Sequence, residues 1–291
     1  MSDKERNSFF SIGLFTFITL LCIVPLLYIV SISLSNDLDI ARYGYSLLPK
    51  KIDFLAYKYI FKTPQMILNS LTVSVVVTVV GTLVSLLLTC AIAYPMTRKD
   101  YRYSRLLTLL MVIPILIQGG LVPWYILITK YLHLQDTLLV LFLPYSVTPW
   151  FVMLMKGFMA TIPFEIVESA KIDGANEYAT FFRIILPLAK PAMATIALFY
   201  AFMFWNDWWL PMLYINNDKL IPLQYMLYKI MSNIQALAMQ ISTGQHVDLS
   251  QIPNESARMA MCVLASLPML AVFPFFQKYF VKGMVVGSIK G

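Results

Sequence analysis

Few residues of this 291-residue sequence have the types and spacing needed for chemistry. No nucleophile, base and acid form a set, and no glycine-rich phosphate loop of the Walker type is present, so neither catalysis nor ATP hydrolysis by this chain is expected. The three cysteines, Cys22, Cys90 and Cys262, stand apart in apolar runs with neither metal-site nor disulfide spacing. Two segments remain of interest: the aromatic and polar run 205–209, and the well-punctuated stretch 161–191.

The composition of the chain indicates a membrane protein. Hydrophobic residues make up 59% of the sequence and charged residues 13%, and the mean hydropathy is +0.72. An average soluble domain carries about 25% charged residues, so this much apolar surface calls for lipid as solvent. The net charge is +7, but Lys and Arg lie between apolar runs, as the positive-inside rule predicts. They form no basic stripe with interleaved aromatics, so we do not expect nucleic-acid binding.

Charge-poor windows predict an all-α protein with six transmembrane helices in a single transmembrane domain, residues 1–291. The predicted spans lie near 9–33, 67–95, 106–129, 138–158, 191–215 and 259–280. The first apolar run is far longer than a signal-peptide core, so we interpret it as a retained span. The short basic segment 98–105 predicts that the N-terminus and the loop 160–190 lie in the cytoplasm and that 216–257 is an extracytoplasmic loop.

The second and third spans carry features of their own. Small residues recur along one ridge of the second span, which predicts close packing either within the chain or against another subunit. They are Ser74, Thr78, Thr82, Ser85, Thr89 and Ala93. Gln118-Gly119-Gly120 predicts a local break in the third span.

The run Trp205-Asn206-Asp207-Trp208-Trp209 falls within the fifth span. A charged group at the centre of a membrane helix costs about 2.5–3.5 kcal/mol, so Asp207 should face a cavity or a partner. Aromatic faces and planar hydrogen-bonding groups suit sugars, which makes Trp205, Asn206, Asp207 and Trp208 candidates for a substrate path. The alternative is a structural hydrogen-bond cluster beside an interfacial tryptophan belt.

Local rules divide the stretch 161–191 into two short helices around a glycine. Pro163 suits a first helical position, and Glu165 then lies in the positive first turn. Gly174 is a natural left-handed stop, and Asn176 can cap a second helix that begins at Glu177. Pro187 is expected to end that helix.

Two roles fit this helix–glycine–helix loop. Apolar residues mixed with Glu168, Lys171 and Asp173 suit docking into a groove of a partner protein, with Ile166, Val167, Ala170 and Ile172 as apolar contacts. The alternative is a helix resting on lipid, with Glu168 and Lys171 as a solvated i,i+3 pair.

The loop resembles the EAA motif of binding-protein-dependent ABC permeases, which has Glu-Ala-Ala, then Gly, then Ile-x-Leu-Pro. This chain has Glu168-Ser169-Ala170, Gly174 and Ile184-Ile185-Leu186-Pro187, with Ser169 in place of the middle alanine. The core 171–175 resembles the carbohydrate-uptake branch, and the tails 277–283 and 287–291 resemble the ends of maltose-type, oligosaccharide and polysaccharide permeases.

The resemblance implies the architecture of a type I ABC importer permease and a set of partners. These are a second homologous permease, two ABC ATPases that bind ATP and Mg²⁺, an extracytoplasmic solute-binding protein and a carbohydrate. No cofactor is expected in this chain. The resemblance assigns ATPase coupling to Glu165, Glu168, Ser169, Ala170, Asp173, Gly174, Ala175, Leu186 and Pro187.

Besides an ABC permease for a solute that is not a sugar, two other classes of membrane protein are alternatives. A secondary transporter should show inverted repeats and several intramembrane ionisable groups, but only Asp207 is of that kind. A membrane enzyme should show clustered His, Asp or Glu at the membrane face. An importer permease is therefore the expectation.

Overall fold

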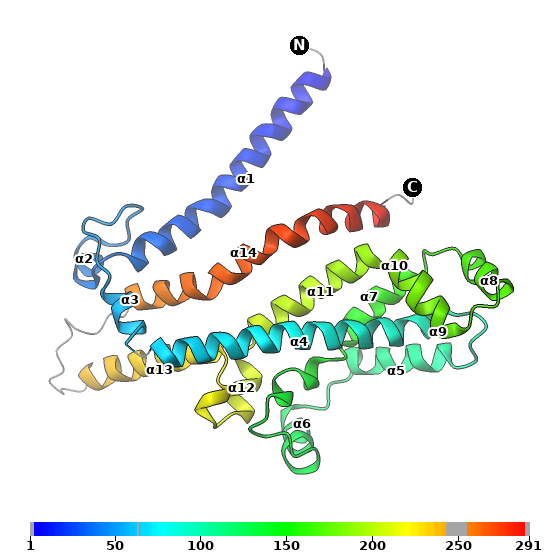
Figure 1. The fold of residues 1–291 in the computed structure, drawn as a ribbon. Coiled ribbons are helices and arrows are strands. Elements are labelled where there is room, and N and C mark those ends of the chain that lie inside the picture. The colour runs from blue at the N-terminus through cyan, green and yellow to red at the C-terminus, as the bar shows by residue number, and fades with distance from the viewer. Residues whose placement is uncertain (1–2, 63, 243–254, 289–291) are drawn as a thin grey trace. The chain divides into compact units, whose positions relative to one another are not determined.

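The computed structural model describes residues 3–62, 64–242 and 255–288, without the side chains of 3–10, 237–242, 272–273 and 275–288. Regular structure in these residues is helical (Figure 1), apart from one isolated β-bridge between Ser35 and Ile52. The chain divides into two units, residues 1–67 with 227–268 and residues 68–226 with 269–291. The tail 277–291, which carries part of the family resemblance, lies outside the described side chains.

The first unit holds α1 (Asp3–Ser33), α2 (Asp37–Tyr43) and α3 (Leu55–Ile60), together with parts of α13 (Leu223–Ser242) and α14 (Glu255–Ser288). Short polar contacts tie its loops together: the Asn36 amide donates to Asp53 at 2.7 Å. The backbone N–H of Ser256 donates to Asp37 at 2.9 Å, which joins α2 to the start of α14. Residues 11–27 of α1 are exposed, as expected for a span that meets lipid.

The second unit is built on α4 (Pro64–Thr97), of which residues 68–97 belong here. Its predicted small-residue ridge is buried at Ser74, Ser85, Thr89 and Ala93. A Cβ on Gly81 would lie 2.9 Å from Cβ of Phe142 and about 3.0 Å from the ring of Phe204. The ridge therefore packs within the chain, because only small residues allow so close an approach.

Prolines and glycines break the third and fourth spans. The third consists of α5 (Ser104–Leu116), α6 (Leu121–Ile126) and the π turn η1 (Leu127–Tyr131), with a bend of 117°. Gly120 at the bend has φ +83°, so the predicted break is confirmed. The fourth span is a pair of 3₁₀ turns, η2 (Leu139–Leu141) and η3 (Leu143–Tyr145), followed by α7 (Pro149–Met159) after a bend of 53°. Pro149, which lacks an N–H, opens α7.

The fifth span is also interrupted, which corrects the prediction of a continuous helix over 191–215. α11 (Lys190–Trp205) ends where the polar run begins, and α12 (Trp209–Tyr214) starts after it. The 3₁₀ turn η5 (Asp218–Leu220) and α13 follow. The segment 216–257, expected to be loop or short-helix material, thus contains the 20-residue helix α13, and its part 243–254 lies outside the described residues.

The membrane spans of the structure are composed differently from the six continuous helices that the sequence predicts. Residues Ser11–Ser33 of α1 and the whole of α4 are each long and apolar enough to cross a membrane. Three bent helix pairs raise the number among the described residues to as many as five. The predicted sixth span, 259–280, lies in the 34-residue helix α14, outside these five.

Candidate functional site

The 160–190 loop begins with a well-formed helix. α8 (Phe164–Ile172) follows Pro163 directly, so the proline precedes the helix by one residue, and Glu165 lies in its first turn as predicted. Gly174 has φ +82°. The N–H of Ala175 donates to the carbonyl of Ala170 at 2.9 Å, and that of Gly174 donates to Lys171 at 3.0 Å. These two bonds form a Schellman motif, which satisfies the last carbonyls of α8.

The second half of the loop differs from the prediction at Pro187. Asn176 caps the helix as predicted, because its side chain accepts the N–H of Ala179 at 2.8 Å. The helical path runs through α9 (Glu177–Ala179), the π turn η4 (Thr180–Ile185) and α10 (Leu186–Leu188). Pro187 therefore lies inside the path, and the chain bends by 80° only after Leu188. The N–H of Leu186, just before the proline, donates to the carbonyl of Phe181 five residues back, so the regular i→i−4 bonding is already interrupted where Pro187 lacks an N–H.

The side chains of α8 divide between two faces. Val167 and Ala170 are buried, with 4% and 5% of their surface exposed. Ile172 is 86% exposed, although it is apolar. It shares an exposed stripe at helical spacing with polar and acidic residues, and we name this stripe the outer face of α8. Its members are Glu165, Glu168, Ser169, Ile172 and Asp173.

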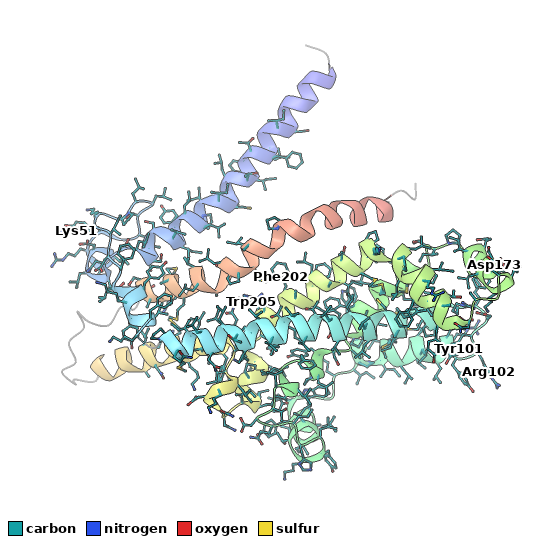
Figure 2. All side chains as sticks on the ribbon, in the orientation of Figure 1. Lys51, Tyr101, Arg102, Asp173, Phe202 and Trp205 are labelled. Carbon is teal, nitrogen blue, oxygen red and sulfur yellow. The ribbon has the colours of Figure 1, made fainter. Side chains whose placement is uncertain are left out.

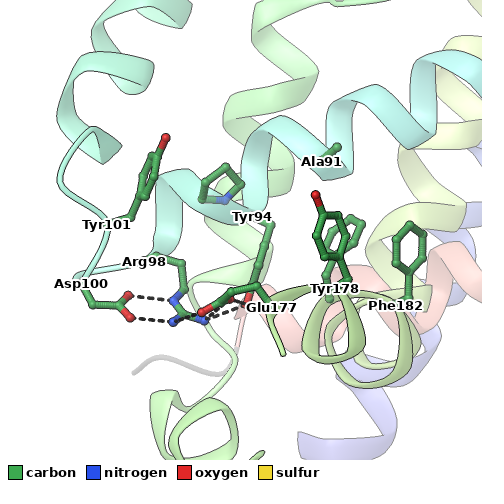
Figure 3. A pocket seen from close by; sticks show the side chains of 10 residues that line it. Ala91, Tyr94, Arg98, Asp100, Tyr101, Glu177, Tyr178 and Phe182 are labelled. Atoms are coloured by element: carbon green, nitrogen blue, oxygen red, sulfur yellow. Dashed lines mark hydrogen bonds and ion pairs between the residues drawn. The ribbon is translucent and has the colours of Figure 1, made fainter. Parts of the chain in front are cut away.

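The loop is fastened to the end of α4 by an ion cluster that the sequence reasoning did not find. Arg98 donates to both carboxylate oxygens of Asp100 at 2.7 and 2.8 Å, and to those of Glu177 at 3.1 and 3.2 Å (Figure 3). Lys171 donates to Asp100 at 2.8 Å and forms an ion pair with Glu177 at 3.2 Å. Lys171 thus pairs with these two groups and not with Glu168, unlike the i,i+3 pair of the alternative in which α8 rests on lipid.

Tyr94 completes the cluster. Its hydroxyl accepts a bond from Arg98 at 2.7 Å and donates to Glu177 at 2.9 Å. The guanidinium of Arg98 is almost fully buried, with 6% of the side chain exposed, whereas Asp100 and Glu177 are about half exposed. We call these five residues the Arg98 cluster: Tyr94, Arg98, Asp100, Lys171 and Glu177.

The charges of the Arg98 cluster stabilise one another. Hydrogen bonds from Arg98 and Lys171 hold the pKa of Asp100 well below its usual range. Burial would raise the pKa of Glu177, but hydrogen bonds from Tyr94 and Lys171 and the charge of Arg98 outweigh it, so this pKa is lowered. Hydrogen bonds to Asp100 and Glu177 raise the pKa of Lys171. Two positive and two negative charges are therefore paired at neutral pH.

A cavity of about 580 Å³ adjoins the cluster. α4 contributes Ala91, Tyr94 and Pro95 to its wall, and aromatic side chains come from the other side. These are Tyr178, Phe181 and Phe182 (Figure 3). Tyr94 and Phe181 contact one another with ring centroids 5.3 Å apart, so aromatic packing supports the ionic contacts between α4 and the loop.

The other candidate site lies at the interruption of the fifth span. Oδ1 of Asp207 accepts the backbone N–H groups of Trp209 at 3.0 Å and Leu210 at 3.3 Å, so Asp207 caps α12. Oδ2 of Asp207 is buried without a hydrogen-bond partner among the described residues. Trp205 is buried, and Trp208 is 39% exposed. Figure 2 shows Trp205 on α11 well away from Asp173, which lies at the tip of the 160–190 loop.

A second fastening lies on the loops after the third and fifth spans. The carboxylate of Asp136 accepts the backbone N–H of Asn216 at 2.5 Å and that of Asn217 at 2.9 Å. These bonds lower the pKa of Asp136. The N–H of Asp136 in turn donates to the carbonyl of Tyr214 at 3.0 Å. Asp136 has φ +55°, an unusual backbone conformation for a residue other than glycine. No pattern in the sequence predicts its contact with the loop after the fifth span.

The described residues contain no group of three or more His, Cys, Asp or Glu that could hold a metal ion. Comparison with known proteins identifies the family to which the chain belongs. Residues 81–286, more than half of the chain, match the family described as "Binding-protein-dependent transport system inner membrane component". The chain belongs to this family: it is the membrane permease component of an ABC importer and not an enzyme.

Particular relatives cover nearly the whole chain. Protein LplC of Bacillus subtilis (strain 168) is 41% identical over 271 residues, covering 92% of this chain and 90% of the relative. The polygalacturonan/rhamnogalacturonan transport system permease protein YtcP of the same organism is 36% identical, covering 98% of this chain and all of the relative. A solved bacterial ABC transporter involved in import of the acidic polysaccharide alginate has a chain of similar fold, with TM-score 0.78 and 26% identity over 96% of this chain and 99% of that one.

Proposed function

We propose that this chain is one of two homologous permease subunits of an importer that translocates an oligosaccharide or polysaccharide. An extracytoplasmic solute-binding protein delivers the carbohydrate, and two ABC ATPases on the cytoplasmic side drive transport. The relatives named for polygalacturonan, rhamnogalacturonan and alginate support a carbohydrate substrate. The N-terminus and the 160–190 loop then lie in the cytoplasm, as the short basic segment 98–105 favours.

The outer face of α8 is the observation that carries this proposal. Ile172, of which 86% is exposed, lies among the carboxylates of this face and would fill an apolar pocket of a partner. The surrounding carboxylates of Glu165, Glu168 and Asp173 call for a groove with basic or hydrogen-bond-donating walls. α8 is therefore the coupling helix, and its partner is the ATPase.

The other coupling residues act by shaping this helix. Ala170 is buried beneath it, and the carbonyl of Ala170 ends the Schellman motif with Ala175. Gly174 supplies the left-handed residue of the same motif. Leu186 and Pro187 lie on α10, where the loop turns into α11. ATP shifts the importer between states only through contacts that differ between them, and the outer face of α8 is where this chain makes such contacts.

The polar interruption of the fifth span is the proposed substrate path. Trp205 ends α11, and Asn206, Asp207 and Trp208 separate it from α12, so the interruption exposes backbone that needs polar partners inside the membrane. Asp207 supplies such a partner through Oδ1 and retains the buried, unpaired oxygen Oδ2. That oxygen would accept a sugar hydroxyl in a translocating state.

Reconstitution of the complete importer tests the proposal. We would place the chain with its second permease, ATPases and binding protein in proteoliposomes and supply galacturonic acid oligomers or neutral malto-oligosaccharides as probes. Uptake of one class should require ATP and the binding protein. Uptake driven by a proton gradient without ATP would instead indicate a secondary transporter, and uptake of neither class under ATP would indicate an ABC permease for another solute.

Substitutions on the outer face of α8 test the docking surface in the same preparation. Glu168→Lys or Ile172→Asp should reduce the ATPase that co-purifies with the permease by about tenfold, because a central interface residue contributes 1–3 kcal/mol. Lys130→Glu is a matched control, since Lys130 is exposed on η1, far along the chain from α8. Full retention of the ATPase by both α8 variants would refute the assignment.

A further inference from the structure

We propose that the Arg98 cluster is the joint through which the coupling loop moves α4. This inference rests on the proposed function, because it concerns how a motion of α8 reaches the membrane helices. The family match and the exposed face of α8 say where force enters the chain. They do not say which contact passes the force on.

The first argument is the position of the cluster on both sides of the loop's turn. Lys171 lies in the last turn of α8 and Glu177 opens α9, so the two flank Gly174. Both side chains reach the same short segment after α4: Lys171 through Asp100, and Glu177 through Arg98. A turn held at both ends cannot rotate on its own, so a displacement of α8 must carry the end of α4 with it.

The second argument is the number of protein groups that accept hydrogen bonds from the guanidinium of Arg98. Its guanidinium donates to Asp100, Glu177 and Tyr94, while only 6% of the side chain is exposed. Separation of α4 from the loop would take Glu177 away from this buried cation and from the hydroxyl of Tyr94, which stays beside Arg98 on α4. A cation as buried as Arg98 would then keep Asp100 as its carboxylate partner, which is unfavourable, so the ion cluster resists separation more than packing alone would.

The third argument is the set of contacts that α4 makes along its length, away from the Arg98 cluster. α4 runs from Arg98 along the second unit for about 45 Å, taking 1.5 Å per residue over residues 68–97. It contacts α11 closely on the way: the hydroxyls of Thr89 and Tyr200 are 2.8 Å apart, and Gly81 lies against Phe204. Phe204 lies in the last turn of α11, two residues before the polar interruption at 206–208. A shift of α4 therefore reaches the proposed substrate path without a flexible segment in between.

Charge exchange tests the joint in the reconstituted importer. Arg98→Glu and Glu177→Arg should each lower binding-protein-stimulated ATP hydrolysis and the uptake per ATP about tenfold, within the 5–150-fold range of typical couplings between sites. The ATPase should still co-purify, because neither residue lies on the outer face of α8. Uptake per ATP is decisive, since a smaller fraction of folded permease leaves that ratio unchanged.

The double variant Arg98→Glu/Glu177→Arg supplies the rescue. In it, positions 98 and 100 are both negative and positions 171 and 177 are both positive, so attraction between the two segments returns. We expect coupling within about threefold of the wild-type importer, which corresponds to less than 1 kcal/mol. Lys99→Glu is the matched control, because it makes the same charge change at an exposed neighbour of Arg98 and should leave coupling unchanged.

Two results would overturn the inference: single variants that couple normally, or a double variant no better than the singles. Should the charge reversals fail to accumulate in the membrane, Glu177→Gln and Tyr94→Phe remove hydrogen bonds at nearly constant shape, and normal uptake per ATP in both would also refute the joint. Failure of the proposed function is separate, since it would appear in the wild-type importer as absence of a bound ATPase or of ATP-driven uptake.

Discussion

At the scale of single residues, Gly174 matters through its backbone. A Cβ at this position would meet no atom within 4 Å, so space does not select glycine. The φ of +82° does, because a residue with a side chain pays about 1–2 kcal/mol in the left-handed region. Glycine therefore sets the end of the coupling helix, and with it the direction in which Ile172 and Asp173 point.

Gly174→Asp should uncouple transport while the protein remains in the membrane. The strained backbone would distort the Schellman motif, and a second carboxylate beside Asp173 would repel the outer face of α8. Gly174→Asn is the matched control, because asparagine tolerates the left-handed region and adds no charge, so its loss of uptake should be several-fold smaller. ATP-driven uptake normalised to permease in the membrane is the measurement. Wild-type uptake by Gly174→Asp would contradict this account of the loop.

Asp207 has two oxygens with different surroundings, and substitutions separate them. Asp207→Ala removes both the cap of α12 and the unpaired Oδ2, whereas Asp207→Asn keeps an acceptor for the N–H groups of Trp209 and Leu210. If Oδ2 contacts the carbohydrate, both variants should lose uptake at low solute concentration while the ATPase stays stimulated. A purely structural cap predicts instead that Asp207→Asn transports normally and only Asp207→Ala is impaired.

At the scale of elements, the packing of α4 depends on one close approach. Gly81 has the Cβ of Phe142 and the ring of Phe204 where a side chain would begin. Phe142 is buried, with 5% of its surface exposed, and Phe204 with 3%, so neither has free space to move into. The small-residue ridge thus fixes the separation of α4 and α11, which is needed if a shift of α4 is to be passed on to α11.

Gly81→Val should lower the thermal stability of the purified permease, because overpacking a dense core costs about 1–3 kcal/mol. Gly157→Ala is the matched control: Gly157 lies on α7 with nothing within 4 Å of its added Cβ, and alanine favours helix. Thermal unfolding in detergent, followed by tryptophan fluorescence, should show a lower midpoint for Gly81→Val only. Equal midpoints for the two variants would mean that α4 and α11 separate easily.

At the scale of the whole molecule, orientation decides which loops meet which partners. The positive-inside rule predicts that 98–105 and 160–190 lie in the cytoplasm and 216–257 outside. The Arg98 cluster joins the first two of these segments, so they must lie on the same side of the membrane. Asp136 likewise joins the loops that follow the third and fifth spans, which the same assignment places together outside.

Labelling of single cysteines in intact cells measures this orientation. After replacement of Cys22, Cys90 and Cys262 by serine, a membrane-impermeant maleimide should modify Lys219→Cys and should modify Lys99→Cys only after the membrane is opened. Lys219 and Lys99 are both exposed, so burial does not bias the comparison. The reverse pattern would place the coupling loop outside and remove its access to an ATPase.

The sequence by itself determined the lipid environment, the family and most of the local form of the 160–190 loop. Composition gave the first of these and the resemblance of the loop to the EAA motif gave the second, while the Gly174 stop, the Asn176 cap and the break at Gly120 come from interactions within a few residues. Sequence reasoning placed the end of the second loop helix at Pro187, because it had no means to foresee that a π turn would admit the proline.

Only the tertiary structure decided which groups meet. Arg98 and Glu177 are 79 residues apart, and the order of the chain does not reveal that the turn of the loop returns to the end of α4. The same holds for Lys171, whose nearest acid along the helix, Glu168, is not its partner. The interruption of the fifth span was also missed, because Asn206 and Asp207 stand within a run over 191–215 that is otherwise apolar and long enough for one span. In the structure the N–H groups of Trp209 and Leu210 donate to Asp207 where α12 begins. Long-range pairing depends on packing summed over whole helices, which no short window of sequence contains.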